Sequence, residues 1–364
     1  MRAMIMAAGL GTRLWPLTGL VSKPMAPILN RPALYHILRL LQRHGIDRVI
    51  INLHHFPDGV WSYFGGGASL GMDIEYSVEE ELLGTAGGVK NNESFLGGET
   101  FLVVSGDALT DIDLTALIAT HRATGGLATL AVKQVADPSL YGVVVAGPDG
   151  RVDGFQEKPS RDKALSHLCN CGIYVFEPAV LDRIPAGAFY DFGSGLFPEL
   201  VASREPIFAH RVNEYWNDVG SLVEYRRGNF DALAGRVRIE IPGREERLGL
   251  WVGERSSLAR NVRVTGPVLI GSDCRIEEDV VLTGPLVIGD HSLIERRSRL
   301  TSAICWSGLF LGEGCRLANT VIGRGAHLHG MVHADGAVLG ERCVVGHGRG
   351  LGARVLEPRA VVMS

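Results

Sequence analysis

The chain has 364 residues, of which 46% are hydrophobic and 21% are charged. This length predicts two domains rather than one small core, and the composition is that of an ordinary folded protein. The 36 basic and 40 acidic residues leave a net charge of −4, which argues against a nucleic-acid binder that relies on a general positive field. A nucleotide needs just a local basic pocket, so the net charge does not exclude a nucleotide ligand.

Membrane and secreted proteins also fit the sequence poorly. The apolar run Met4–Met6 is too short for a signal peptide, and no stretch approaches the length of a membrane span. The six cysteines form no C-x-x-C pair, and Cys169 and Cys171 stand too close together for a usual zinc knuckle. We therefore expect reduced thiols, a cytoplasmic location, and partners that include neither a membrane nor a nucleic acid.

Residues 1–235 alternate strand-like and helix-like segments, which is typical of an α/β domain. The elements expected in chain order are a strand at Met4–Met6, a helix opened by Pro32 and ended by Gly45, strands at Val49–Ile51 and Phe101–Val104, and a helix from Leu114 with Asp113 as its N-cap.

A different period begins near residue 250, where an apolar residue recurs at every sixth position. The series is Val252, Leu258, Val264, Ile270, Ile276, Leu282, Ile288, Ile294 and Leu300. The spacing breaks near Trp306 and resumes at Leu311. Hexapeptide periodicity predicts a parallel β-helix, in which each coil adds aliphatic residues to a dry core. We expect a left-handed β-helix at residues 250–364, joined to the α/β domain by a polar linker at residues 236–249.

The first strand runs into a turn with the sequence Gly9-Leu10-Gly11-Thr12-Arg13. Glycines directly after a strand let backbone N–H groups cradle a phosphate. Alone this is weak evidence, because a plain strand-to-loop turn has the same sequence, and the third glycine of a dinucleotide fingerprint is missing. Arg13 and, ten residues later, Lys23 strengthen it, since two cations beside a glycine loop fit a triphosphate.

Blocks throughout the first half together resemble the signature of the sugar-1-phosphate nucleotidylyltransferases, or nucleotide-sugar pyrophosphorylases. They are Gly9–Leu14, Pro16–Thr18, Lys23–Pro24, Leu83–Gly88, Ser105–Asp107, Tyr141–Val144, Glu157–Pro159, Asn170–Gly172 and Trp216–Gly220. Their order is that of the family, and the β-helix matches its longer members, such as the GDP-mannose and ADP-glucose pyrophosphorylases. The resemblance implies a Rossmann-like domain with a mixed sheet that joins a sugar 1-phosphate to an NTP and releases pyrophosphate.

The resemblance also implies roles for five charged residues. Arg13 would hold the leaving pyrophosphate, Lys23 would stabilise charge around the α-phosphate, and Lys158 would hold the incoming sugar phosphate. Asp107 and Asp218 would share a Mg²⁺, an ion that prefers hard carboxylate oxygens. The local sequence around Asp107 favours a turn or helix cap, and the full set of motifs reverses that preference.

Further contacts follow from the same resemblance. The nucleotide would meet Ala8, Gly9, Gly11, Thr12, Gly84, Thr85, Gly87 and Gly88. The sugar phosphate would meet Gly142, Glu157, Lys158 and Asn170. Cys171 departs from the alanine or threonine of relatives, and we expect it to alter packing.

The loop Leu83–Gly88 looks most like that of guanylyl-transferring members. We expect its backbone N–H and C=O groups to meet the edge of the base, with guanine preferred. One of Glu79, Glu80 and Glu81 could accept from guanine, although a solvated strand end is the simpler expectation for at least two of them.

The leading hypothesis is thus guanylyl transfer from GTP to mannose 1-phosphate or a similar sugar-like 1-phosphate. The enzyme is expected to be a homo-oligomer that associates through its β-helix near Leu309–Leu311.

Three alternatives stay open: a UDP-, dTDP- or ADP-sugar pyrophosphorylase, a regulatory member without activity, and a second, acyl-transferring activity of the β-helix. Retention of all five charged residues argues against the regulatory member. The β-helix histidines, His327, His329, His333 and His347, come without an acyl-carrier signature, and His54-His55 fits a strand end better than a metal site.

Overall fold

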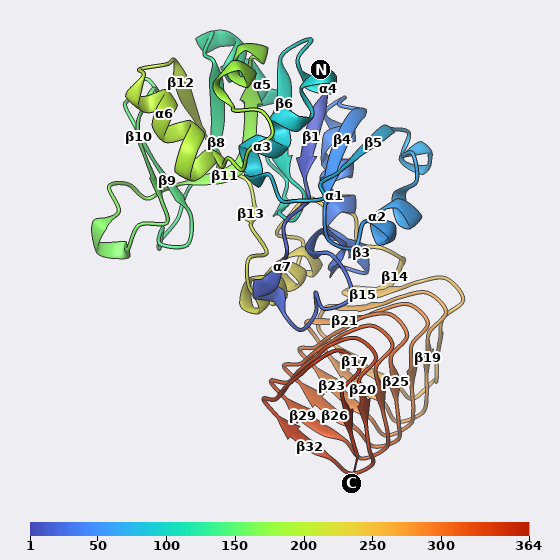
Figure 1. The fold of residues 1–364 in the computed structure, drawn as a ribbon. Helices are drawn as coiled ribbons and strands as arrows, with labels where there is room; N and C mark the ends of the chain where they lie inside the picture. Colours follow the sequence, from blue (N-terminus) through green and yellow to red (C-terminus); the bar gives the residue numbers. More distant parts are fainter. Residues whose placement is uncertain (364) are drawn as a thin grey trace. The chain divides into compact units, whose positions relative to one another are not determined.

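The structure is a computed structural model that describes residues 1–363 (Figure 1). The chain forms two compact units. Unit 1 contains Met1–Leu10 and Leu34–Asp218, and unit 2 contains Gly11–Ala33 and the chain from Val219 onward. This division differs from a boundary at residue 235, because the N-terminal segment Gly11–Ala33 and the helix after Val219 belong with the C-terminal strands.

Unit 1 is built on a mixed nine-stranded sheet. Four of its strands are parallel and lie in the order β5-β4-β1-β6. They are β1 (Ala3–Met6), β4 (Arg48–Leu53), β5 (Asp73–Val78) and β6 (Phe101–Ser105). This is the order of a dinucleotide-binding half-fold, in which progress across the sheet reverses beside the first strand. Ligands of open α/β sheets bind outside the carboxyl ends of the strands at that reversal, so the ends of β1 and β6 locate the expected site.

The other strands of unit 1 extend this sheet. The long strand β11 is antiparallel to β6, β8 and β9, β10 follows β9, and β12 is parallel to β8. Their bounds are β8 (Ala128–Gln134), β9 (Gly142–Ala146), β10 (Val152–Glu157), β11 (Leu168–Phe176) and β12 (Ile207–Arg211). A separate antiparallel ribbon consists of β7 (Leu109–Thr110) and β13 (Trp216–Asn217). The helices are α1 (Ala33–Arg43), α2 (Pro57–Phe64), α3 (Gly84–Asn91), α4 (Glu93–Leu96), α5 (Leu114–Thr124) and α6 (Phe197–Ala202).

The elements predicted for the first half form where the pattern placed them. The side chain of Asp113 accepts a hydrogen bond from the Ala116 N–H at 3.0 Å, so it is the N-cap of α5. Helix α1 begins at Ala33 rather than Pro32, because Pro32 belongs to the short strand β3. Its apolar face is fully buried, as expected for a helix that covers a sheet.

The C-terminal part of unit 2 is a parallel β-helix, consistent with the left-handed form predicted (Figure 1). Each of the first six coils contributes one short strand to each of three sheets, and β33 and β34 follow in a seventh coil. The first sheet contains β15 (Leu250–Val252), β18 (Val268–Ile270), β21 (Leu286–Ile288), β24 (Ile304–Cys305), β27 (Val321–Ile322), β30 (Val338–Leu339) and β33 (Val355–Leu356). The second contains β16 (Ser257–Leu258), β19 (Arg275–Ile276), β22 (Leu293–Ile294), β25 (Phe310–Leu311), β28 (His327–Leu328), β31 (Val344–Val345) and β34 (Val361–Val362). The third contains β17 (Arg263–Thr265), β20 (Val281–Thr283), β23 (Arg299–Thr301), β26 (Arg316–Ala318), β29 (His333–Asp335) and β32 (Gly350–Gly352).

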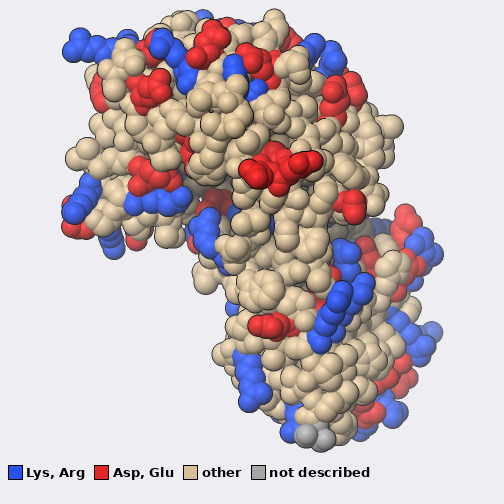
Figure 2. Space-filling view, viewed as in Figure 1, with Lys and Arg blue, Asp and Glu red and all other residues tan. Residues whose placement is uncertain are grey.

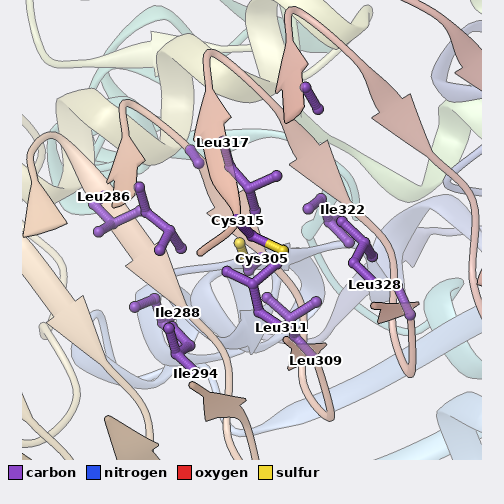
Figure 3. Packing of buried hydrophobic residues seen from close by; sticks show 14 of the residues in the cluster. Leu286, Ile288, Ile294, Cys305, Leu309, Leu311, Cys315, Leu317, Ile322 and Leu328 are labelled. Atoms are coloured by element: carbon purple, nitrogen blue, oxygen red, sulfur yellow. The ribbon is translucent and has the colours of Figure 1, made fainter. Parts of the chain in front are cut away.

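The break in the hexapeptide pattern is a change of coil length. In the first coils, paired residues of adjacent coils are 18 positions apart, as in the Arg255–Asp273 pair. In the next coil Thr283 pairs with Thr301 and Val287 pairs with Ile304. Three residues lie between Thr283 and Val287 but two lie between Thr301 and Ile304, so one residue is missing from the connection. Later coils repeat every 17 residues. The six-residue series therefore slips by one position per coil while its members stay in one core, which Figure 3 shows for Ile288, Cys305 and Leu311.

Two expectations for unit 2 are corrected. The predicted linker at residues 236–249 contains β14 (Arg244–Arg247), which pairs antiparallel with β15 and covers the first edge of that sheet. The predicted surface at Leu309–Leu311 is wrong for both leucines, which are 1% and 0% exposed in the core. Successive strand residues face opposite sides, so Phe310 alone lies outside, stacked on His327 at 4.1 Å between ring centroids.

The N-terminal segment of unit 2 has little regular structure of its own. It contains 3₁₀ helices at Thr12–Leu14 and Lys23–Met25 and the hairpin formed by β2 (Pro27–Ile28) and β3 (Arg31–Pro32). Helix α7 (Leu222–Leu233) follows Val219, and its N-cap Ser221 accepts from the Glu224 N–H at 3.2 Å.

Acidic and basic side chains are mixed over the visible face of the molecule (Figure 2). This agrees with the small net charge and differs from the single-sign surface of a general nucleic-acid binder. Among the helices within residues 1–363, none combines the length and the apolar character that a membrane crossing needs.

Candidate functional site

The carboxyl ends of β1 and β6 are tied closely together in unit 1. The Gly106 N–H donates to the Met6 carbonyl at 2.9 Å, and a Cβ added to Gly106 would lie 2.7 Å from a methyl of Ile5. The Ala7 N–H donates to the side chain of Asn52 at 2.8 Å. The glycine between Ser105 and Asp107 therefore lets the two strand ends approach, and Ala8 and Gly9 continue from the same edge.

The candidate metal ligands Asp107 and Asp218 flank one end of the ribbon formed by β7 and β13. In that ribbon Trp216 pairs with Thr110 and Asn217 with Leu109. Asp107 precedes β7 by two residues and Asp218 follows β13 by one residue, so the backbone of both flanks the same end of the antiparallel ribbon. Both carboxylates are half-buried. The two residues come from chain segments more than 100 positions apart, and the ribbon brings them to the same end of unit 1.

The rest of the ribbon is fastened by hydrogen bonds that leave these two aspartates at its end. The Thr110 hydroxyl donates to the Tyr215 carbonyl at 2.7 Å, and the Asp111 carboxylate accepts from the Tyr215 N–H at 2.8 Å. Asp111 and Asp113 thus have structural roles, as ribbon clamp and helix cap. Among the described helices, the N-cap of α5 is Asp113, as predicted, rather than Asp107.

The donor set fits a magnesium ion that is shared with a bound phosphate. Within residues 1–363, no group of three or more histidine, cysteine, aspartate or glutamate side chains could hold a metal. Two carboxylates would therefore supply a minority of the six oxygens that Mg²⁺ requires. Sites of this kind take their remaining ligands from water and substrate phosphates, which is the expected mode for a nucleotide substrate.

The candidate sugar-phosphate residues form a second group in unit 1. The Lys158 Nζ lies 2.7 Å from the Glu157 Oε1, and the two side chains are 58% and 36% exposed. The other oxygen of Glu157 lies against Gly142 and Gly193, where an added Cβ would meet it 3.3 Å away at Gly142 and inside van der Waals contact at Gly193. Lys158 has a φ of 44°, a strained conformation for a non-glycine residue and one that gathers at functional sites.

Three further family blocks meet around Asn170. Its side-chain oxygen accepts from the Gly172 N–H at 3.0 Å, and its amide donates to the Tyr174 hydroxyl at 2.7 Å. The indole N–H of Trp216 donates to the Cys171 carbonyl at 3.0 Å, and the Trp216 ring meets the Tyr141 ring edge-on at 5.2 Å. The amide of Asn170 is therefore locked in one orientation, a requirement for discriminating sugar hydroxyls.

Cys171 is a packing residue, as expected. It is 2% exposed, and burial raises the pKa of its thiol far above the usual range. All six cysteines are buried and unpaired within the described chain. Burial also raises the pKa of Cys169 and of Cys305 to about 12, so these thiols stay protonated at neutral pH.

The expectation for the loop Leu83–Gly88 is corrected, because helix α3 begins at Gly84. Its first backbone donors already have partners within unit 1. The N–H groups of Ala86 and Gly87 each donate to the Tyr190 carbonyl at 2.9 Å. The N–H group of Thr85 donates to the Asp191 carboxylate at 2.9 Å, and the Thr85 hydroxyl donates to the same oxygen at 3.0 Å. Tyr190 and Asp191 thus supply acceptors for these three N–H groups at the start of α3. The three groups are not free donors, which removes this support for guanine.

The glutamates before this helix divide into two kinds. Glu79 is 4% exposed, accepts from the Asn52 amide at 2.7 Å and from the Leu83 N–H at 3.1 Å, and lies against Gly88. Its carboxylate is a structural brace. Glu80 and Glu81 are exposed, as the simpler expectation held. His54 bonds the Glu79 carbonyl at 2.8 Å, which gives this histidine a strand-end role.

The candidate triphosphate residues Gly11, Thr12, Arg13 and Lys23 belong to unit 2. The backbone of Gly11 is left-handed, with a φ of 67°, and an added Cβ would lie 2.8 Å from the Cβ of Lys23. The Thr18 hydroxyl donates to the Gly11 carbonyl at 2.9 Å. Gly11 therefore lets the turn that carries Arg13 pack closely against the backbone of Lys23. Arg13 and Lys23 thus belong to one local structure.

Sequence reasoning missed four residues that shape the site: Asn52, Tyr190, Asp191 and Gly193. Each acts by holding a candidate residue or its backbone in place. A buried asparagine after a strand or a glycine in the run Phe192–Leu196 carries no motif, and the bonds between Thr85 and Asp191 span 106 positions. The signal for them is spatial, so a single sequence could not reveal it.

Comparison with known proteins identifies the family of this chain. A family model described as nucleotidyl transferase matches residues 2–234. The chain belongs to the nucleotidyl transferase family. This nucleotidyltransferase is 39% identical over 337 residues to a UTP–glucose-1-phosphate uridylyltransferase of Synechocystis, a match that covers 88% of this chain and 87% of that protein. It is 37% identical over 234 residues to a mannose-1-phosphate guanylyltransferase of Mycobacterium tuberculosis, covering 64% and 65%. It is 28% identical over 349 residues to mannose-1-phosphate guanylyltransferase 1 of Arabidopsis thaliana, covering 93% and 95%.

Solved structures of the same fold resemble the nucleotidyltransferase over about two thirds of its chain. HddC of Yersinia pseudotuberculosis, complexed with GMP-PN, matches with a TM-score of 0.55 at 23% identity, covering 63% of this chain and 97% of that one. A UDP-glucose pyrophosphorylase complexed with UDP-glucose matches with a TM-score of 0.57 at 21% identity, covering 64% and 98%. At these identities the likeness concerns the fold.

Proposed function

We propose that this nucleotidyltransferase transfers a guanylyl group from GTP to mannose 1-phosphate or a similar sugar-like 1-phosphate and releases pyrophosphate. The observation that supports a nucleotidyl transfer is the β7–β13 ribbon, because its pairing brings the backbone of Asp107 and of Asp218 to the same end. In this proposal the two carboxylates would hold a Mg²⁺ ion, which would neutralise charge on the substrate phosphates.

The reaction asks for positioning and charge neutralisation rather than covalent help. An oxygen of the sugar phosphate attacks the α-phosphorus, and the bond to the pyrophosphate breaks on the opposite side. In this proposal Lys158 orients the attacking phosphate, Lys23 offsets charge at the α-phosphate, and Arg13 holds the leaving pyrophosphate. Mg²⁺ held by Asp107 and Asp218 would supply further neutralisation of the phosphate charge.

The sugar would lie against Asn170, Glu157 and the backbone of Gly142. Glu157 accepts hydrogen bonds and Asn170 can donate as well as accept, so together they suit a pair of neighbouring hydroxyls. Their orientations are held by Gly193 and Tyr174. A site with fixed polar groups rejects a sugar that leaves one of them unpaired, which is how stereoisomers are distinguished.

The choice of guanine rests on the relatives named mannose-1-phosphate guanylyltransferase. A second candidate is uridylyl transfer from UTP to glucose 1-phosphate, which the Synechocystis relative favours through its 39% identity over most of both chains. The two candidates share every charged residue named above and differ in the base and sugar contacts.

A competition experiment separates the candidates. GTP, UTP, ATP and dTTP are offered together at equal concentration, first with mannose 1-phosphate and then with glucose 1-phosphate, and the nucleotide sugars are quantified. GDP-mannose should exceed every other product by about tenfold or more, the factor that one mismatched buried hydrogen bond gives. Predominance of UDP-glucose would replace the guanylyl proposal by the uridylyl one, and absence of every nucleotide sugar would contradict both.

We also propose a cytoplasmic homo-oligomer. The support for association is the last coil of the β-helix, where Val355, Val361 and Met363 are 56%, 59% and 55% exposed. Exposed apolar residues that lie near one another favour contact with another protein surface.

A further inference from the structure

Trp306 is an exception in a column of glycines. The register of the first β-helix sheet aligns it with Gly271, Gly289, Gly323 and Gly340 in the neighbouring coils. Trp306 is nevertheless 2% exposed, and it is the largest of the fully buried side chains. The repeat does not require a large side chain at this position, so Trp306 is expected to have a role outside the β-helix core.

The indole of Trp306 begins a hydrogen-bonded relay that runs out of the β-helix. Its Nε1–H donates to the Tyr225 hydroxyl on α7 at 2.8 Å, and that hydroxyl donates to the Pro27 carbonyl at 2.6 Å. The Tyr225 hydroxyl thus accepts one bond and donates one, and its ring meets the indole edge-on at 6.4 Å. Both side chains are buried, so removing the Tyr225 hydroxyl would leave the Trp306 N–H without its acceptor.

A second side chain of α7 holds the same segment. The Leu29 N–H donates to the Asn229 side chain at 3.0 Å, and Asn229 is fully buried. Leu29 and Asn30 form the turn between β2 and β3 with φ values of 48° and 64°. Left-handed backbone at two successive non-glycine residues is strained, and it persists where the surroundings fix it. The Asn30 amide adds a bond to the Ile288 carbonyl of the β-helix at 2.8 Å.

The relay ends beside the candidate triphosphate residues. The Ala26 N–H donates to the Lys23 carbonyl at 3.0 Å, which closes the 3₁₀ turn that leads into Pro27. Gly11 in turn lies against Lys23, as described above. The segment touches the β-helix again at Gly19, where an added Cβ would lie 2.5 Å from Pro358. Helix α7 itself begins four residues after Asp218 in the chain.

We propose that Trp306 and Tyr225 are positioning residues through which the β-helix fixes the segment that binds the NTP phosphates. This inference rests on the proposed function, which assigns Arg13 and Lys23 to the triphosphate. The β-helix then has a part in catalysis within its own chain, because its fourth coil sets the geometry of Lys23 through Tyr225 and Pro27. The sugar-phosphate residues Glu157, Lys158 and Asn170 have no part in the relay.

The test compares Trp306→Phe and Tyr225→Phe with the full-length enzyme. Phenylalanine keeps an aromatic ring at each position. Trp306→Phe removes the bond to Tyr225, and Tyr225→Phe removes that bond together with the bond to Pro27. We expect the KM for NTP to rise about three- to tenfold, the range for one lost hydrogen bond that leaves a buried partner unsatisfied. The KM for the sugar phosphate should stay within twofold. Because both substitutions cut the same bond, the double variant should be no worse than Tyr225→Phe alone.

Val345→Ala is the matched control. Val345 is fully buried in β31, in the same β-helix core, and it contacts no part of the relay. It should lower the unfolding midpoint as the relay variants do and leave the KM for NTP unchanged. Amide hydrogen exchange of residues 11–33 should accelerate in both relay variants and not in the control.

The outcomes separate the two proposals. An active wild type whose relay variants keep the wild-type KM for NTP, or raise both KM values alike, would overturn the relay. A wild type that is inactive with every NTP would overturn the proposed function, and unchanged exchange of residues 11–33 in the relay variants would then overturn the relay independently.

Discussion

The carboxylate of Glu157 shows how tightly single residues constrain this site. It lies between Gly142 and Gly193, and neither position has room for a Cβ beside it. Gly193 adopts a backbone conformation that alanine tolerates, since its φ is not among the positive values. Glycine is therefore needed at position 193 because a Cβ there would collide with the carboxylate of Glu157, a candidate sugar-phosphate residue.

Gly193→Ala should displace Glu157 and weaken sugar-phosphate binding. We expect the KM for the sugar phosphate to rise about tenfold, the cost of one displaced hydrogen-bonding group, with the KM for NTP unchanged. Steady-state kinetics with each substrate varied in turn measures both. Gly98→Ala is the matched control, because an added Cβ at Gly98 meets nothing within 4 Å. Equal kinetics for the two variants would show that Glu157 does not contact the sugar phosphate.

At the scale of elements, the patterns with a local cause could be predicted and those with a distant cause could not. The strand Phe101–Ser105 and the cap Asp113 follow from neighbouring residues, and both form as expected. The run Leu83–Gly88 resembles a loop, yet it begins helix α3 because Tyr190 and Asp191 supply its caps. The change from 18- to 17-residue coils appeared in the sequence as a break near Trp306, and the strand register places its origin at Ser302–Ala303.

Each coil of the β-helix depends on its neighbours, so a cavity in one coil should destabilise the whole element. Leu328 is fully buried in β28. Leu328→Ala should lower the free energy of unfolding by about 2–5 kcal/mol, the range for a buried leucine. Leu248→Ala, at a residue that is 98% exposed, should change it by less than about 0.5 kcal/mol. Urea unfolding followed by circular dichroism compares them, and equal midpoints would contradict the assignment of Leu328 to the core.

At the scale of the whole molecule, the α/β domain and the β-helix could be predicted from two different periodicities. The division of the chain into units could not, because it depends on contacts between Gly11–Ala33, α7 and the β-helix. Leu29 and Asn229 are 200 positions apart, and neither belongs to a recognisable motif. The charged residues of the site were found through a family resemblance that local physics alone would not have supplied, as the competing cap at Asp107 illustrates.

Removing residues 250–364 should therefore affect more than assembly. Tyr225 would lose its bond to Trp306, and the strained turn of segment 11–33 would lose the bond from Asn30 to Ile288. We expect rapid trypsin cleavage after Arg13 in the truncated protein and slow cleavage there in the full chain, and a smaller assembly by sedimentation. A truncated protein that resists cleavage and keeps full turnover would contradict this view, and a full-length monomer at micromolar concentration would contradict the proposed oligomer.

The claim on which everything else depends is that Asp107 and Asp218 hold the metal of a nucleotidyl transfer. The direct measurement is the rate of nucleotide-sugar formation by the wild type, Asp218→Asn and Asp111→Asn at several Mg²⁺ concentrations. Asp218→Asn should lose about two orders of magnitude or more in turnover, as expected when a metal ligand is lost, and should keep its fold by circular dichroism. Asp111→Asn, on the same ribbon, should stay within a few-fold of the wild type, because an amide oxygen can still accept from the Tyr215 N–H. Near-normal turnover of folded Asp218→Asn at limiting Mg²⁺ would contradict the account.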